Sequence, residues 1–375
     1  MTDLSITIYQ RGDGYRALVS YEQEFISCNL PIYKSDLHST LKMISTTLSR
    51  IIENTHEKYY QNEVNIPDNI CEDDLNELAQ LGILEYIFQG VGNKSSGREL
   101  IADLKEFSRM GNRSITIMAE NFWVPWQLVY DGQLDGKVDR NGFWGFKHTI
   151  DFMPIVDTET RRRVKIDSSD LNLSFNLHRG LDEKLILGQK SFFDEVKQNN
   201  PNFTYKTVTK EQKVISAFKN RNFKDSIVYF FCHAQSPQDM DATPEDILLR
   251  LNTNGEDLTL HRLITRAAGT TFSSKPLVFI NACESTFMSP VFYNGFVPYF
   301  LTKGSGGILG TLTKIPGIFA SEFAINFFKQ FFAGESVTDI MPSVRRKFLE
   351  EHKNILGLCY QSFRNCKLQS WESRI

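Results

Sequence analysis

Four short apolar runs in the second half of the chain constrain its fold most strongly. They cover residues 171–177, 227–232, 277–282 and 308–312, and several are rich in β-branched and aromatic residues. Helical patterns lie between most of them. Strands that alternate with helices form parallel sheets whose two faces are covered by helices. The sequence therefore predicts an α/β fold with a mainly parallel sheet sandwiched by helices.

The first 108 residues follow a different pattern. Two alternating segments joined by turn residues 11–14 predict a β-hairpin. Apolar residues at three- and four-residue steps predict a helix from Asp36 to about Tyr60 and a second one from about Asp73 to Phe88. We therefore expect a small N-terminal α+β accessory region over 1–108 and a second domain over 109–375.

The composition is that of an ordinary globular protein. The 375 residues include 42 Lys and Arg against 45 Asp and Glu, so no strong field favours a nucleic-acid partner. The six cysteines form no C-x-x-C pair, which fits a reducing compartment. Neither a signal-peptide pattern nor an apolar run of about 18 residues is present. We expect a cytoplasmic protein without membrane contact.

Two reactive residues directly follow two of the apolar runs. His233 comes after 227–232, and Cys283 comes after 277–282. The carboxyl ends of neighbouring parallel strands meet at one edge of the sheet, so the two side chains should face each other if these strands are neighbours. A cysteine thiolate is a nucleophile, and an imidazole can take up its proton and later return it. The pair predicts a cysteine peptidase.

Four motifs in this part of the chain occur in the order of a known family. They are Val-Pro-Trp-Gln-Leu at 124–128, Tyr-Phe-Phe-Cys-His-Ala at 229–234, Val-Phe-Ile-Asn-Ala-Cys-Glu-Ser at 278–285, and Gly-Ser-Gly-Gly-Ile-Leu-Gly-Thr-Leu at 304–312. Together they resemble the CHAT peptidases, which are related to caspases, separase and the gingipains. Each motif is weak by itself, but the ordered set spans about residues 115–350.

The resemblance implies a caspase-like fold and a division of roles. Cys283 attacks the scissile carbonyl and His233 transfers the proton, without an obligatory third catalytic side chain. The backbone N–H groups of Ala234 and Cys283 form the oxyanion hole, which stabilises the developing negative charge. The candidate substrate-binding residues are Glu284, Thr311, Leu312, Thr313 and Gly317. The expected partners are a protein substrate and a separate activating or regulatory protein, and neither a metal nor a cofactor is expected.

Several positions depart from the family pattern. Ala234 replaces the usual glycine, which costs about 1 kcal/mol if its φ is positive. Thr313, Gly317 and Gln127 replace a frequent Trp, a frequent Asp and the usual Glu. These departures leave open an alternative, a catalytically inactive caspase-like interaction module. Peptidases of this type often serve bacterial defence or cell-suicide pathways, so the resemblance implies a regulated protease of that kind.

Other functional interpretations have less support. Gly304 and Gly306 do not form a dinucleotide-binding fingerprint, since Leu309 stands where the third glycine is needed. His178 and His261 have no partners at the spacing of metal ligands. We interpret the acidic group within 239–246 as a solvated loop, with attraction of a basic substrate residue as the alternative. The three arginines at 161–163 are also read as a loop, with processing or docking as the alternative.

Overall fold

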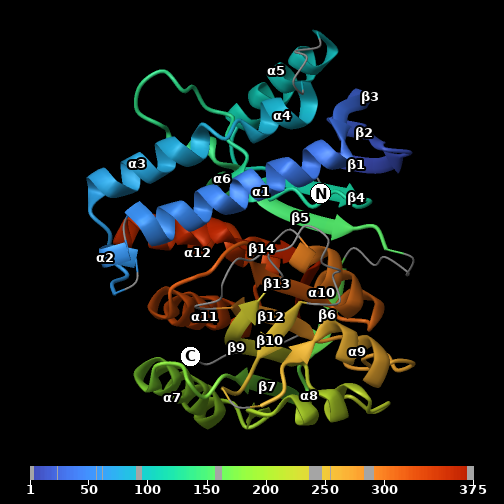
Figure 1. Ribbon diagram of the computed structural model, residues 1–375, viewed down its shortest axis with the longest axis vertical. Helices are drawn as coiled ribbons and strands as arrows, with labels where there is room; N and C mark the ends of the chain where they lie inside the picture. Colours follow the sequence, from blue (N-terminus) through green and yellow to red (C-terminus); the bar gives the residue numbers. More distant parts are fainter. Residues whose placement is uncertain are drawn as a thin grey trace.

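The fold contains two main sheets and the helices that cover them (Figure 1). It is seen in a computed structural model that describes residues 4–22, 24–55, 57–60, 62–89, 95–156, 163–235, 247–253, 255–282 and 291–369. The N-terminal elements lie in the upper part of Figure 1 and the larger sheet lies in the lower part. Within the described residues, no helix combines the length and the apolar character needed to cross a membrane.

The smaller sheet has five strands in the order β3-β2-β1-β4-β5. Their bounds are β1 Leu4–Arg11, β2 Gly14–Tyr21, β3 Glu24–Tyr33, β4 Ser114–Ala119 and β5 Thr149–Pro154. The antiparallel pairing of β1 with β2 confirms the predicted hairpin. Strand β1 also pairs in parallel with β4, where Leu4 lies opposite Ile115. The division of the chain at 108/109, which falls between these two paired strands, stays a prediction.

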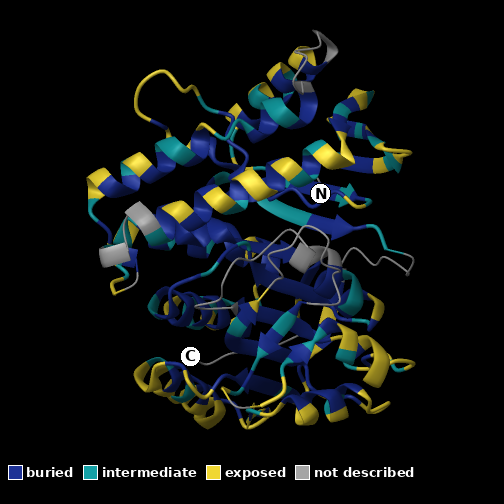
Figure 2. Ribbon diagram, viewed as in Figure 1, coloured by how far each residue is buried: buried dark blue, intermediate teal, exposed yellow. Residues whose placement is uncertain are grey.

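Helices cover this sheet, and one of the helices predicted from the sequence differs from those in the structure. They are α1 Lys34–Arg50, continued by the π-helical turn η1 Ile51–Thr55, and then α2 Glu57–Tyr60, α3 Asp68–Ala79, α4 Ile83–Gln89 and α5 Ser95–Arg109. The single helix predicted from about Asp73 to Phe88 is wrong, because Gly82 adopts a φ of +56° and separates α3 from α4. Figure 2 shows α1 with exposed residues along its outer face.

The larger sheet has a parallel centre in the order β8-β7-β9-β12-β13, and β10, β11 and β14 extend it in antiparallel orientation. Its strands are β7 Leu171–Leu177, β8 Phe203–Val208, β9 Ile227–Gln235, β10 Leu248–Arg250, β11 Leu258–Thr259, β12 Leu277–Ala282, β13 Gly307–Thr311 and β14 Tyr360–Phe363. All four strands predicted from the apolar runs are confirmed.

Helices pack on both faces of this sheet. Their bounds are α7 Glu183–Asn199, α8 Glu211–Phe218, α9 Leu260–Arg266, α10 Val291–Thr302, α11 Gly317–Phe332 and α12 Val337–His352. Tyr229 of β9 contacts Phe328 of α11, with ring centroids 5.1 Å apart. The next residue, Phe230, faces Phe300 of α10 at 6.4 Å. Because successive strand residues point to opposite faces, these contacts confirm the predicted helix-covered sheet.

The remaining short elements connect the two sheets. Strand β6 Arg163–Asp167 pairs in parallel with β15 Asn365–Gln369, and the short helices are α6 Trp144–Lys147, η2 Trp126–Leu128, η3 Arg140–Gly142 and η5 Ile355–Cys359. The buried guanidinium of Arg345 in α12 donates hydrogen bonds to the backbone carbonyls of Gly145, Gly357 and Tyr360. Helix α12 is thereby fixed to α6, to η5 and to the start of β14.

Candidate active site

The strands that precede the predicted catalytic residues are direct neighbours. Strands β9 and β12 pair in parallel, and Cys232 lies opposite Ala282 at the end of the ladder. His233 follows within β9, and its side chain is partly exposed. Cys283 and Glu284 lie outside the described residues, as do the acidic group within 239–246 and Arg161 and Arg162. The pairing of β9 with β12 meets the condition on which the sequence analysis placed His233 opposite Cys283, and the geometry of the dyad stays a prediction.

The five described cysteines have raised pKa values, whereas a cysteine nucleophile must be deprotonated. Four of them are buried, and Cys28 is partly exposed. Burial raises the pKa of Cys71 to about 11 and that of Cys359 to about 12. It also raises the pKa of Cys28, Cys232 and Cys366. These residues remain protonated at neutral pH, so none of them supplies a reactive thiolate.

Ala234, the residue that replaces the family's glycine, fits its backbone position without strain. It lies within β9, and it is not among the described residues whose φ is positive. An alanine methyl group is therefore tolerated there, since the steric cost arises only in the left-handed region. The departure at Ala234 gives no structural reason to expect loss of the fold around His233.

The predicted substrate-binding residues of the 311–317 segment are mostly buried. The side chains of Thr311 and Thr313 are 0% exposed, Leu312 is partly buried, and Gly317 is buried at the start of α11. The Leu312 N–H donates to the Cys359 carbonyl at 2.7 Å. Thr313 forms a buried hydroxyl–hydroxyl hydrogen bond of 3.1 Å with Ser49 of α1. The role of these residues in substrate binding stays a prediction.

A polar network lies beneath the end of β12, and the sequence analysis did not identify it. Asn281 is fully buried, and its Nδ2 donates to the Tyr229 hydroxyl at 3.1 Å and to the Ala320 carbonyl at 2.7 Å. Its Oδ1 accepts from the Tyr360 hydroxyl at 2.7 Å. The amide thus binds groups from β9, β14 and α11, two residues before Cys283, and it fixes β12 against its neighbours.

His178 is a second residue that the sequence analysis missed, because it was considered there only as a metal ligand. It follows β7, the neighbour of β9 on the side away from β12. Its imidazole ring lies 4.3 Å from that of His233, centroid to centroid. No local sequence pattern indicates this contact, since the two residues are 55 positions apart (233 − 178).

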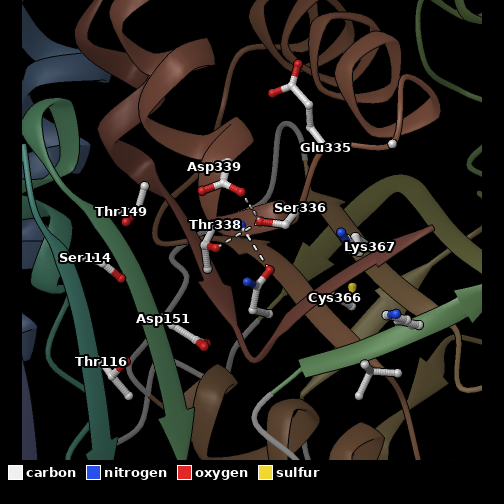
Figure 3. Close-up of a pocket in the computed structure, with 14 residues that line it drawn as sticks. Ser114, Thr116, Thr149, Asp151, Glu335, Ser336, Thr338, Asp339, Cys366 and Lys367 are labelled. Atoms are coloured by element: carbon white, nitrogen blue, oxygen red, sulfur yellow. Dashed lines mark hydrogen bonds between the residues drawn. The ribbon is translucent and has the colours of Figure 1, made fainter. Parts of the chain in front are cut away.

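A separate cavity of about 730 Å³ lies between the smaller sheet and the β6–β15 pair, beside the start of α12 (Figure 3). Its walls come from β4, β5, β6, β15 and the Ser336 turn, and they include both acidic and basic side chains, among them Asp339 and Lys367. The Ser336 hydroxyl, at the start of α12, donates to the Asp339 carboxylate at 2.6 Å beside the cavity. None of the predicted site residues that the structure describes lines this cavity.

The parallel sheet is covered by helices, His233 lies near the end of β9, and Cys283 comes directly after β12 in the sequence. This arrangement defines the caspase-like class of α/β fold. The chain belongs to the CHAT domain family, whose sequence profile matches residues 119–366. No curated protein matches the sequence.

Two solved structures have a similar fold. Both are crystal structures of the Saccharomyces cerevisiae separase–securin complex, which match with TM-scores of 0.55 and 0.51 at 10% sequence identity. Each alignment covers 98% of this chain and 30% of the separase chain, so this chain spans less than a third of the separase that it matches. At this identity the likeness concerns the fold alone.

Proposed function

We propose that this protein is a cysteine endopeptidase that cleaves a protein substrate through an acyl-enzyme intermediate, with Cys283 as the nucleophile and His233 as its acid/base partner. The observation that supports it best is the parallel pairing of β9 with β12, in which Cys232 and Ala282 are opposite. His233 follows Cys232 in β9, and Cys283 follows Ala282 in the sequence. The raised pKa values of the five other cysteines also favour Cys283.

The proposed reaction uses these groups in sequence. The Cys283 thiolate attacks the scissile carbonyl, and the backbone N–H groups of Cys283 and Ala234 stabilise the oxyanion. His233 then donates its proton to the leaving amine, and afterwards it activates the water that hydrolyses the thioester. The inactive-module alternative has less support, because Ala234 fits its strand without a positive φ.

The proposed biological setting is a regulated protease of a bacterial defence or cell-suicide pathway, controlled by a separate protein partner in the cytoplasm. Membership of the CHAT family supports the regulated peptidase. The free thiols of Cys28, Cys71, Cys359 and Cys366 support a reducing compartment. The separase that shares this fold was solved as a complex with securin, which motivates the search for a protein partner here.

A peptidyl probe that alkylates active-site cysteines tests the proposed chemistry. We expect the wild-type chain to be labelled, Cys283→Ala to lose the label, and the matched variant Cys28→Ala to keep it, since Cys28 is the one partly exposed cysteine among the described residues. His233→Ala should lower turnover of a cleavable peptide by about two to four orders of magnitude. Labelling and mass spectrometry should be carried out between pH 5 and 9, with and without candidate partners.

Two outcomes would contradict the proposal. Equal labelling of the wild type and Cys283→Ala under every condition would exclude Cys283 as a reactive thiol. Full turnover in His233→Ala would assign the proton transfer to another group.

A further inference from the structure

His178 lies beside His233 because of the strand order of the larger sheet. Strand β7 pairs in parallel with β9, with Leu177 opposite Phe231. The His178 N–H extends this ladder by donating to the Phe231 carbonyl at 3.0 Å. The imidazole rings of His178 and His233 then meet edge to face, with centroids 4.3 Å apart and an interplanar angle of 68°. Such aromatic pairs have a preferred geometry and restrict each other's orientation.

The turn after β7 holds the His178 ring in place. The Gly180 N–H donates to His178 Nδ1 at 3.1 Å, and only 4% of His178 is exposed. A Cβ atom at Gly180 would lie 2.8 Å from Cε1 of the ring, so the glycine allows the backbone to approach the imidazole closely. Because Nδ1 accepts a hydrogen bond, the proton of the neutral ring is on Nε2.

The ring is also kept uncharged by its surroundings. The pKa of His178 is lowered to about 4, mainly by burial and also by the nearby His233 and Arg250, while Asp257 acts in the opposite direction. Arg250 of β10 and Asp257 form a two-point ion pair, with N–O distances of 2.9 and 3.0 Å. The proposed reaction requires a positively charged His233 next to a thiolate. A neutral His178 does not repel that charge.

We propose that His178 is a positioning residue for His233: its fixed, uncharged ring restricts the neighbouring imidazole to the orientation used in proton transfer. This inference rests on the proposed function. It adds to the proposed site a residue that contacts neither the substrate nor the reacting atoms. Because a misplacement of about 1 Å can lower a rate about a hundredfold, we expect loss of the ring to lower kcat between about tenfold and a hundredfold.

Two substitutions at His178 test the contribution of the ring and that of its hydrogen bond separately. His178→Asn keeps an acceptor for the Gly180 N–H and removes the ring, so kcat should fall while KM stays within about twofold. His178→Phe keeps a ring beside His233 and should recover most of the lost kcat. His261→Asn, at an exposed histidine of α9, is the matched control and should behave as the wild type. A change confined to KM, or equal kcat in His178→Asn and the wild type, would overturn the proposal.

A second measurement does not depend on activity. In the Cys283→Ala chain with carbon-13-labelled histidine rings, we expect a nuclear Overhauser effect between the rings of His178 and His233. In Cys283→Ala/His178→Asn, the His233 ring signals should shift and broaden as its side chain samples several rotamers. An absent Overhauser effect, or unchanged His233 signals in the double variant, would overturn the positioning role.

The two measurements also separate this inference from the proposed function. A chain that neither cleaves peptides nor reacts with the probe at Cys283 would contradict the peptidase. The Overhauser effect and the His233 line widths would still decide whether His178 fixes the imidazole.

Discussion

Single buried side chains determine how the end of β12 is held. Asn281 forms three hydrogen bonds, and through the Tyr229 hydroxyl it is linked to Gln189 of α7 at 2.7 Å. All these groups are buried. Buried polar groups cost free energy when a partner is removed, so this network stabilises one arrangement of the strands around it.

Asn281→Leu tests this network. The leucine removes the acceptor of the Tyr360 hydroxyl and the donor to the Ala320 carbonyl. At roughly 1 to 3 kcal/mol for each buried group that loses its partner, we expect the free energy of unfolding to fall by about 3 kcal/mol. Urea denaturation measures it, with the exposed Asn222→Leu as control. A change below about 0.5 kcal/mol in Asn281→Leu would show that the network adds little.

At the scale of elements, helix α1 and the turn η1 contact the segment that follows β13. Ser49 and Thr313 share a buried hydrogen bond, and Glu53 of η1 lies 3.7 Å from the Lys314 ammonium group. Thr313 occupies the position where the family frequently has Trp, and here α1 packs against it. The packing of α1 gives a physical reason for a small residue at Thr313.

Ser49→Ala tests whether α1 holds this segment. The substitution removes one buried hydrogen bond, so we expect stability to fall by about 1 kcal/mol and amide hydrogen exchange over 312–316 to become faster. Ser39→Ala, at an exposed position of the same helix, is the matched control. Unchanged exchange over 312–316, measured by mass spectrometry, would show that α1 does not restrain the segment.

At the scale of the whole molecule, three buried titratable groups with large pKa shifts contribute to how stability responds to acid. Burial lowers the pKa of His148 to about 3 and that of His178 to about 4. Burial raises the pKa of Asp74 to about 7. Between pH 4 and 6.5 the unfolded chain therefore binds two more protons at the histidines, and the folded chain binds one more at Asp74. At these three groups the unfolded state gains more protons, so their combined contribution to stability should decrease as the pH falls through this range.

His148→Gln isolates one of these groups. The histidine ring accepts from the Arg113 N–H and shares a hydrogen bond of 2.8 Å with Ser108, and a glutamine amide can take over such contacts without titrating. As the pH falls from 6.5 to 4, the wild type should lose up to about 1.4 kcal/mol of unfolding free energy per pH unit relative to the variant. Urea denaturation at several pH values measures it. Parallel pH curves would show that His148 does not titrate differently in the folded state.

The sequence by itself determined the parallel centre of the larger sheet, since a strand buried on both faces must be an almost continuous apolar run, as at 227–232 and 277–282. It also indicated that His233 and Cys283 directly follow two of these apolar runs, whereas the pairing of the two strands was decided by the tertiary structure. Only the tertiary structure decided that His178 packs on His233 and that Ser49 meets Thr313. These contacts join residues far apart in the chain, and they depend on strand order and helix packing, which no local pattern encodes.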